Sequence, residues 1–255
     1  MNIEDSAVFR GWLSALDAWH LSNLRVPEVT RALRALSSAY IERRDTAVHR
    51  VLDSAGKRAA FALFYAPLHF LTTYHVVQAL EAHQPAPRLI VDLGCGTGVT
   101  GAAWAIASGG TPVLGIDRHP WAVAEARWTY RALGVEGRVR VSDISRGAAL
   151  RPGTAVIAGY VLNELPQAAR ERLQTQLVKA AGRGVRVLII EPVARKFTPW
   201  WPSAELQIRS INAGRADEWR FPITLPPSLQ LLDKAAGLDH SELTAKSLYC
   251  PGSIS

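Results

Sequence analysis

Cysteine is scarce in this chain of 255 residues, which contains only Cys95 and Cys250. So distant a pair excludes a disulfide-rich scaffold and lacks the spacing of a cysteine-ligated metal site. No apolar run reaches the roughly 18 residues of a membrane span. The N-terminus, MNIEDSAVFRG, lacks the basic, apolar, small-residue order of a signal peptide. We therefore expect no metal, no membrane partner and a cytoplasmic location.

Acidic residues are the second shortage. The chain has 29 lysines and arginines against 22 acids, a net charge of +7. Such a balance favours polyanionic partners such as nucleic acid or a ribonucleoprotein. The alternative is an ordinary solvated surface, because the sequence has no tight polybasic run. With 48% apolar residues, the chain is long enough for a large core domain with a helical extension.

The most informative stretch is LIVDLGCGTG, which ends at Gly98. A short apolar run leads into Asp92, passes through Gly94, Gly96 and Gly98, and enters an alanine-rich segment. This pattern predicts a buried parallel strand, a tight loop and the start of a helix. Glycine is needed where the backbone has positive φ or where a ligand comes close. Since open α/β sheets bind ligands at the carboxyl ends of their strands, we predict a nucleotide-like cofactor site here.

Two cofactor classes fit this loop. Residues 96–101 read GTGVTG and match the dinucleotide fingerprint G-x-G-x-x-G. The frame D-x-G-x-G-x-G from Asp92 also fixes a carboxylate, which suits a cationic amino-acid end and would repel a pyrophosphate. That frame resembles the first motif of class I S-adenosylmethionine-dependent methyltransferases. The resemblance implies S-adenosyl-L-methionine as cofactor, held by Asp92, Gly94, Cys95, Gly96 and Gly98.

Strands and helices alternate beyond this loop. Further strands are predicted at 112–116, 138–142, 154–158 and 185–190, with helical patterns between them. The alternation predicts a doubly wound, Rossmann-like α/β sheet. Residues 1–86 have helical periodicity throughout and are predicted to form an all-helical cap on a core of residues 87–255. Within the cap, Pro67 is expected to kink or divide the helix at 58–80.

Acids also end the second and third strands. Asp117 follows the glycines by about twenty residues, where a ribose-binding carboxylate belongs; its alternative role is to cap the next helix. Arg118 is placed over the adenine edge. In related methyltransferases the acid after the third strand accepts a hydrogen bond from the adenine amino group, and the next residue packs on the ring. The resemblance assigns these roles to Asp143 and Ile144.

The methyl-transfer site is expected after the fourth strand, which faces the sulfonium methyl group in class I methyltransferases. Tyr160 is predicted to wall this site and to contact the cofactor, while Asn163 and Glu164 orient or deprotonate a nucleophile. Alternatively, Asn163 and Glu164 only cap the following helix. Glu191 ends the fifth strand in the same crevice, and Tyr65 of the cap is either a cofactor contact or a core residue. The segment lacks the Asn-Pro-Pro-Tyr type of motif, which argues against base N-methylation.

Several pieces in order resemble one subfamily: YAPL at 65–68, VLNEL at 161–165, IIEP at 189–192 and DEWRF at 217–221. They are similar to the methyltransferase-like proteins associated with the mitochondrial small ribosomal subunit and their bacterial relatives. Longer members carry a cysteine cluster, whereas this chain has none there and Arg220 replaces an expected cysteine. The resemblance implies RNA or the small ribosomal subunit as partner. A small-molecule methyltransferase and a cofactor-binding assembly factor without turnover are the alternatives.

The first prediction concerns the two acids assigned to the cofactor. Asp92→Ala and Asp117→Ala each remove a carboxylate from the expected crevice, and a charge-assisted hydrogen bond contributes about 1.5–3 kcal/mol. Each variant is therefore expected to bind the cofactor about tenfold more weakly or worse in titration calorimetry. Unchanged affinity would remove these assignments.

Overall fold

A computed structural model describes the chain apart from residues 1, 43–51, 53, 147–149 and 253–255. The chain divides into two compact units. The helical unit comprises Met1–Leu71 and Phe221–Leu243, and the sheet unit comprises Thr72–Arg220 and Thr244–Ser255. The expected division between residues 86 and 87 stays a prediction. The first segment of the helical unit ends earlier, at Leu71, and a C-terminal segment belongs to the same unit.

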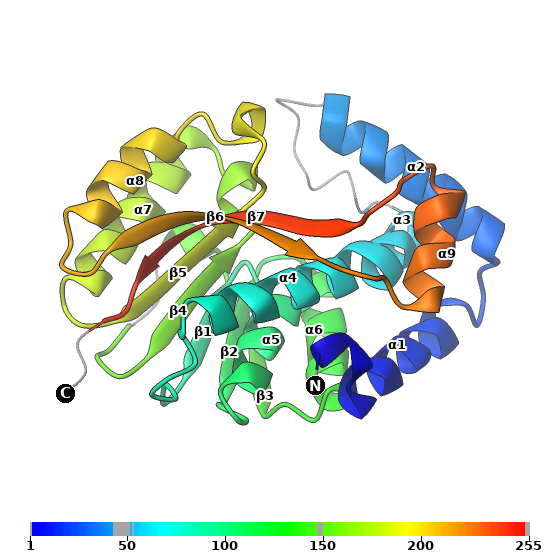
Figure 1. The fold of residues 1–255 in the computed structure, drawn as a ribbon, viewed down its shortest axis with the longest axis horizontal. Helices are drawn as coiled ribbons and strands as arrows, with labels where there is room; N and C mark the ends of the chain where they lie inside the picture. The colour runs from blue at the N-terminus through cyan, green and yellow to red at the C-terminus, as the bar shows by residue number, and fades with distance from the viewer. Residues whose placement is uncertain (1, 43–51, 53, 147–149, 253–255) are drawn as a thin grey trace. The chain divides into compact units, whose positions relative to one another are not determined.

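The helical unit is built around a cluster of aromatic rings. Its elements are η1 (Ile3–Asp5), α1 (Ala7–His20), α2 (Val26–Glu42), α3 (Ala55–Ala60), η3 (Phe61–Tyr65), the start of α4 (Ala66–Ala79) and α9 (Pro227–Ala235) (Figure 1). Helix α1 begins after Ser6, whose hydroxyl accepts a hydrogen bond from the Phe9 N–H at 3.1 Å. The rings of Phe9, Trp12 and Phe70 lie 5.3–5.7 Å apart, centre to centre. This cluster fixes α1 against α4.

The helix that contains Pro67 is continuous from Ala55 to Ala79 and is not divided. A π-helical segment, η3, lies directly before the proline turn. Proline lacks an N–H and clashes with the carbonyl four residues earlier; the wider i→i+5 turn relieves that clash. By length and composition this helix could cross a membrane, but 72% of its 18-residue apolar window is buried in the protein. Such burial is typical of a core helix.

A seven-stranded sheet forms the core of the sheet unit, in the order β3-β2-β1-β4-β5-β7-β6 (Figure 1). The strands are β1 (Ile90–Leu93), β2 (Val113–Asp117), β3 (Gly137–Val141), β4 (Ala155–Gly159), β5 (Arg186–Glu191), β6 (Arg215–Pro222) and β7 (Glu242–Cys250). Strands β1 to β5 are parallel, and β7 runs antiparallel to β5. The predicted doubly wound α/β class is confirmed. The strand order reverses between β1 and β4, which is where such sheets bind ligands.

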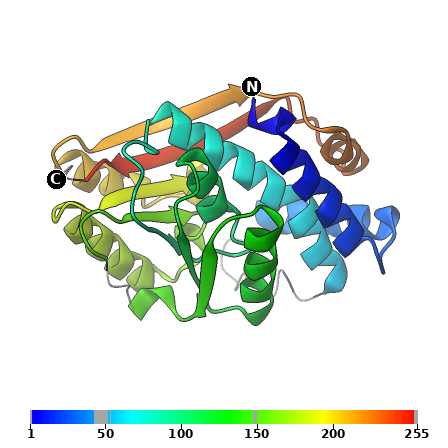
Figure 2. The same cartoon turned by 90° about the horizontal axis from the view of Figure 1, so that it is seen from below.

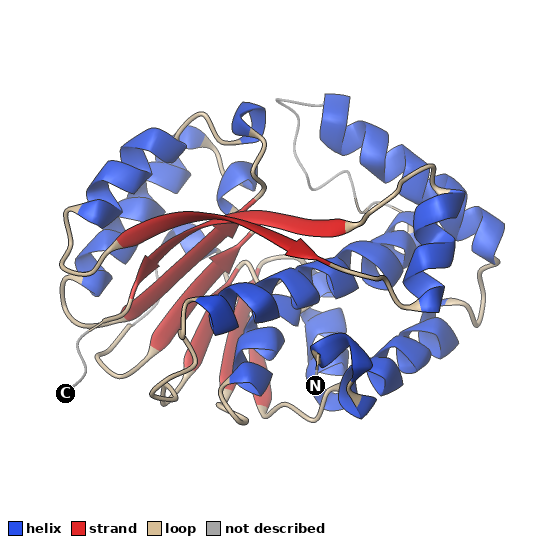
Figure 3. Cartoon of the chain, in the orientation of Figure 1, coloured by secondary structure: helices blue, strands red, loops and turns tan. Residues whose placement is uncertain are grey.

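Helices cover both faces of the sheet, as Figures 2 and 3 show. They are α5 (Val99–Ala107), α6 (Pro120–Ala132), α7 (Gln167–Ala181) and α8 (Trp201–Arg209), with short turns η4 (Ile144–Arg146), η5 (Leu162–Glu164) and η6 (Arg195–Phe197). Val91 and Leu93 join the apolar cluster that includes α7 and α8. Asp92, between them, points to the other face and bonds to α5. The period-two alternation of a strand therefore separates the packing face of β1 from its polar side chain.

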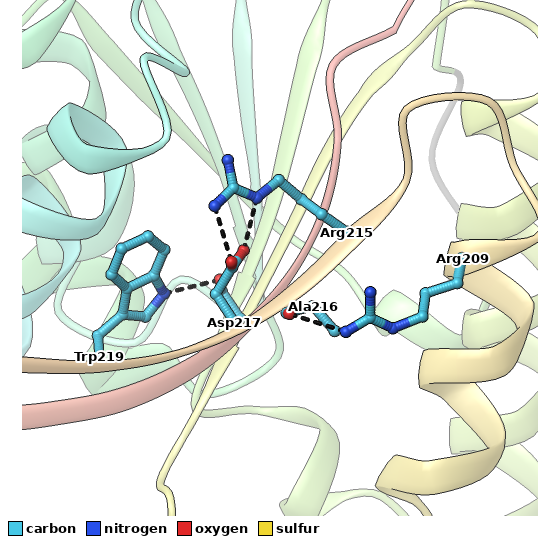
Figure 4. A network of polar contacts seen from close by, with 6 residues as sticks. Arg209, Arg215, Ala216, Asp217 and Trp219 are labelled. Atoms are coloured by element: carbon cyan, nitrogen blue, oxygen red, sulfur yellow. Dashed lines mark hydrogen bonds and ion pairs between the residues drawn. The ribbon is translucent and has the colours of Figure 1, made fainter.

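Strand β6 was not predicted, because its sequence RADEWRFP is charged rather than apolar. An edge strand tolerates this composition, since one side of its ladder faces no other strand. Hydrogen bonding to β7 places it in the sheet. Two side-chain contacts add to this: the Trp219 indole N–H donates to Ser247 Oγ of β7 at 2.9 Å, and Arg209 of α8 donates to the Ala216 carbonyl at 3.1 Å. Within the strand, Arg215 pairs with Asp217 at 2.7 Å (Figure 4). Pairing with β7, and not hydrophobic burial, therefore defines this strand.

Two tryptophans of α1 allow a matched test of the core. Trp12 is 1% exposed in the aromatic cluster, whereas Trp19 is 56% exposed. Trp12→Ala is expected to lower the free energy of unfolding by about 3–5 kcal/mol through lost burial and a residual cavity. Trp19→Ala is the control and is expected to change it by about 0.5 kcal/mol or less. Urea unfolding measures both, and similar losses would contradict the observed packing of α1.

Candidate functional site

The loop after β1 uses glycine for two different reasons. Gly94, Gly96 and Gly98 have φ of +68°, +52° and +81°, a region that disfavours other residues. A Cβ on Gly94 would lie 2.3 Å from Val161 Cγ2, so this glycine permits close packing. A Cβ on Gly96 would meet nothing within 4 Å. The loop therefore leaves open space beside Gly96, where a ligand can approach the backbone.

Asp92 is fully buried beneath this loop. Its Oδ2 accepts hydrogen bonds from Thr100 Oγ1 and the Gly101 N–H, both at 2.8 Å. Its Oδ1 is buried without a partner among the described residues. The pKa of Asp92 is raised to about 7, chiefly by burial; the hydrogen bonds from Thr100 and Gly101 oppose this shift and the charge of Asp117 adds to it. Asp92 thus ties β1 to α5 and keeps one acceptor unused.

Asp117 holds the glycine loop from the neighbouring strand. Its Oδ2 accepts from the Gly96 N–H at 2.9 Å, and its Oδ1 accepts from the His119 N–H at 2.8 Å. This second bond is to the N–H of His119, the N-cap residue of α6, and no side-chain capping bond is formed at that helix end, so the capping alternative is not confirmed. A carboxylate has about four acceptor positions, so capacity for two hydroxyl groups remains.

Four other residues that were predicted to contact the cofactor also belong to the sheet unit. Asp143 Oδ1 accepts from the Ser145 N–H at 2.8 Å. Ile144 is 7% exposed and belongs to the apolar core, which leaves little of it for a ligand. The Cys95 side chain is buried and burial raises the pKa of its thiol, so only its backbone is available to a ligand. Arg118 is exposed.

Tyr160 follows β4 with φ of +58°, an uncommon conformation for a bulky residue. Its N–H donates to the Ile190 carbonyl at 2.8 Å. Burial raises the pKa of its hydroxyl, which is hydrogen-bonded to Thr72. Strained backbone of this kind costs about 1–3 kcal/mol and concentrates at functional sites. The strain supports a functional position for the end of β4.

Glu164 connects the ends of β4 and β2. Solvent reaches its side chain, yet the surrounding protein raises its pKa. The charge of Asp117 raises that pKa further, and Arg118 opposes the shift. These three side chains, from two different strand ends, therefore lie within electrostatic reach of one another.

The side chain of Asn163 is occupied on both sides. Its Nδ2 donates to Glu191 Oε2 at 2.5 Å, and its Oδ1 accepts from the Trp200 indole N–H at 3.1 Å. Glu191, fully buried, also accepts from the Leu162 N–H at 3.0 Å. The capping alternative is wrong for both Asn163 and Glu164, because Pro166 is the N-cap of α7 and no side chain bonds there. Asn163 instead anchors η5, which carries Glu164.

Tyr65 belongs to the helical unit. It ends the π-helical segment η3, and its hydroxyl lies 2.9 Å from Ser37 Oγ. Burial raises the pKa of this hydroxyl. Its role as a cofactor contact stays a prediction.

Sequence reasoning missed Tyr130 of α6, which is 1% exposed. A Cβ on Gly98, Gly115 or Gly137 would lie 2.8 Å, 2.8 Å or 2.2 Å from an atom of Tyr130. Three glycines from the loop, β2 and β3 thus form a slot for one ring. The available signal was Gly115 and Gly137 inside strands, where glycine often marks close approach.

Among the described residues, no group of three or more His, Cys, Asp and Glu side chains is placed to hold a metal ion. The acidic side chains at the ends of these strands are instead suited to hydrogen bonding and to the binding of positive charge.

Residues 72–158 match the family model of the methyltransferase small domain. The family match and the sheet order support a class I methyltransferase. A relative, the ribosomal RNA large subunit methyltransferase G of Streptomyces coelicolor, is 48% identical over 66 residues, which are 24% of this chain and 18% of that protein. The chain thus aligns with less than a fifth of the curated relative's length.

Two solved structures match much of this chain. The mitomycin 7-O-methyltransferase MmcR has a TM-score of 0.51 at 14% identity, covering 94% of this chain and 74% of that one. A putative RNA methyltransferase from Pyrococcus horikoshii has a TM-score of 0.47 at 13% identity, covering 88% and 98%. At 14% identity, the MmcR structure shows the fold alone.

The buried carboxyl group predicts a pH dependence of stability. The folded-state pKa of Asp92 is raised to about 7 from 3.8. Its contribution to stability is full below pH 3.8 and is lost as pH rises through 7, by at most about 1.4 kcal/mol per pH unit. Asp92→Asn keeps an acceptor for Thr100 and Gly101 but cannot ionise, so its stability is expected to fall less over this range.

Urea unfolding at about pH 5 and pH 7 measures the difference. Glu136→Gln, which changes an exposed acid of the sheet unit, is the control and is expected to follow the wild type. Equal losses in the wild type and Asp92→Asn would contradict the raised pKa.

Proposed function

We propose that this chain is an S-adenosyl-L-methionine-dependent methyltransferase that acts on RNA. The observation that carries the proposal is the space beside the glycine loop, where Asp92 Oδ1 is buried without a partner among the described residues and a Cβ on Gly96 would meet nothing within 4 Å. Burial raises the pKa of Asp92, Glu164 and Glu191, and the neighbouring acids Asp117 and Glu164 add smaller shifts in the same direction. Acids gathered at these strand ends favour a cationic ligand over a pyrophosphate.

The residues present fit this cofactor. Asp92 Oδ1 is a buried acceptor without a donor, and the space at Gly96 admits a ligand against the backbone. In our assignment, Asp117 binds the ribose hydroxyls, Arg118 borders the adenine, and Asp143 accepts from the adenine amino group. When bound, S-adenosylmethionine supplies a methyl group already activated by a positively charged sulfur.

In this proposal, the residues of the chain position the methyl acceptor and take up the proton that it loses. Tyr160 walls the methyl site in a fixed backbone conformation, and Asn163 positions η5 through Glu191 and Trp200. Glu164, with its raised pKa, is suited to take the proton that a hydroxyl or amine acceptor loses. Holding the acceptor in line with the methyl group accounts for most of the proposed catalysis.

Two observations support an RNA substrate. A segment of the chain is similar to the Streptomyces ribosomal RNA methyltransferase, and the net charge is +7. The finer resemblance to the mitochondrial small-ribosomal-subunit family is part of the same proposal, as is a cytoplasmic location. A small-molecule methyltransferase and an assembly factor without turnover bind the same cofactor, so the cofactor is tested first.

Two glycines give a matched test of the cofactor site. Gly96 and Gly134 have φ of +52° and +67°, and a Cβ on either meets nothing within 4 Å. Alanine at either position is expected to cost about 1–2 kcal/mol of stability from the left-handed conformation. Only Gly96→Ala is expected to weaken binding of S-adenosylhomocysteine, about tenfold or more, because its methyl group enters the proposed cofactor space.

Titration calorimetry on the folded variants and the wild type measures the affinity. Absence of S-adenosylhomocysteine binding to the wild type would overturn the proposed function. Equal affinities for Gly96→Ala and Gly134→Ala would overturn the placement of the cofactor at this loop.

A further inference from the structure

Strand β3 is an edge of the seven-stranded sheet and carries two exposed arginines. A Cβ on Gly137 would overlap Tyr130 of α6, so the odd-numbered residues of β3 face that helix. Arg138 and Arg140 alternate with them and are exposed on the opposite face. This edge of the sheet thus presents two guanidinium groups to solvent.

Helix α6 extends the same basic region around the edge. Arg127 donates to the Val139 carbonyl at 3.2 Å, which brings its guanidinium to β3. Arg131 lies one turn further on the exposed side of α6. Trp121 and Trp128, half-buried and seven residues apart, border this side of the helix.

The sign of the charge is nearly uniform here. From 118 to 141 the exposed charged residues are Arg118, Arg127, Arg131, Glu136, Arg138 and Arg140. Within the described part of the chain, no hydrogen bond or ion pair is found for the side chain of Arg131, Arg138 or Arg140. Five exposed arginines against one exposed acid give this surface a net positive charge.

We propose that this surface, the β3-edge surface (Arg118, Arg127, Arg131, Arg138 and Arg140), binds the phosphate backbone of single-stranded RNA. The inference rests on the proposed function and names where its substrate is held. Arginine pairs with phosphate through two parallel hydrogen bonds, and neighbouring indole faces stack on bases. Arg118 follows β2 directly after Asp117, so the surface reaches the crevice from which methyl transfer is proposed.

The test compares two triple charge reversals in the full chain. The first changes Arg131, Arg138 and Arg140 to Glu. The control changes Arg172, Lys179 and Arg183 to Glu; these exposed residues lie on and just after α7, which contacts β5, and three strands separate β5 from β3 in the sheet. Both variants alter the net charge equally, so a difference between them reports position and not total charge.

Fluorescence anisotropy with a labelled single-stranded oligoribonucleotide measures affinity between about 50 and 200 mM salt. The β3-edge variant is expected to lose about tenfold or more in affinity, and its salt slope is expected to fall by about 2, from three lost phosphate contacts. The control is expected to lose about twofold or less. Unchanged S-adenosylhomocysteine affinity in both variants establishes that the cofactor site is intact.

Equal losses in the two variants, or no RNA binding by the wild type, would overturn the inference. Competition by polyglutamate as effective as that by RNA would also overturn it and assign the surface to an acidic protein. Because S-adenosylhomocysteine binding is measured separately, a wild type that binds it but not RNA contradicts this inference and the RNA substrate, and leaves the cofactor assignment of the proposed function standing. A wild type that does not bind it contradicts the proposed function.

Discussion

The buried carboxylate of Asp92 is the contact on which the sheet unit depends most. It leaves β1 on the face opposite the apolar cluster of α7 and α8, and it fixes the first turn of α5 through Thr100 and Gly101. The glycine loop between these elements then has little freedom. Asp117 restrains the same loop from β2 through the Gly96 N–H. Two acids on neighbouring strands thus determine the shape of the open space at Gly96.

Residues that differ in their burial stabilise the η5 turn after β4. Glu191 and Trp200 are not placed to act on a substrate, but they fix both ends of the Asn163 amide. Arg170 supports Trp200 from above its ring, at 5.8 Å from the ring centre. Lys246, buried against Trp201, opposes the raised pKa of Glu191. The exposed acid Glu164 is therefore presented on a turn whose own polar groups are already satisfied.

Local patterns predicted the parts of the fold that depend on local physics. The apolar strand before Asp92, the positive-φ glycines and helix α7 follow from periodicity and backbone sterics. Strand β6 was missed because its pairing with β7, a strand distant in the sequence, and not its composition, defines it. The anchoring role of Asn163 and the position of Tyr130 depend on groups far apart in the chain, which no single window of sequence shows.

The slot around Tyr130 has a consequence for how this sequence can change over evolution. Gly98, Gly115 and Gly137 lack a side chain where the tyrosine ring lies. A larger residue at any of them requires Tyr130 to become smaller or to move, and at Gly115 the Cys95 side chain must give way as well. A smaller ring would leave a void among three backbones. The four positions are therefore expected to be replaced jointly among homologues, as one unit of covariation inherited together.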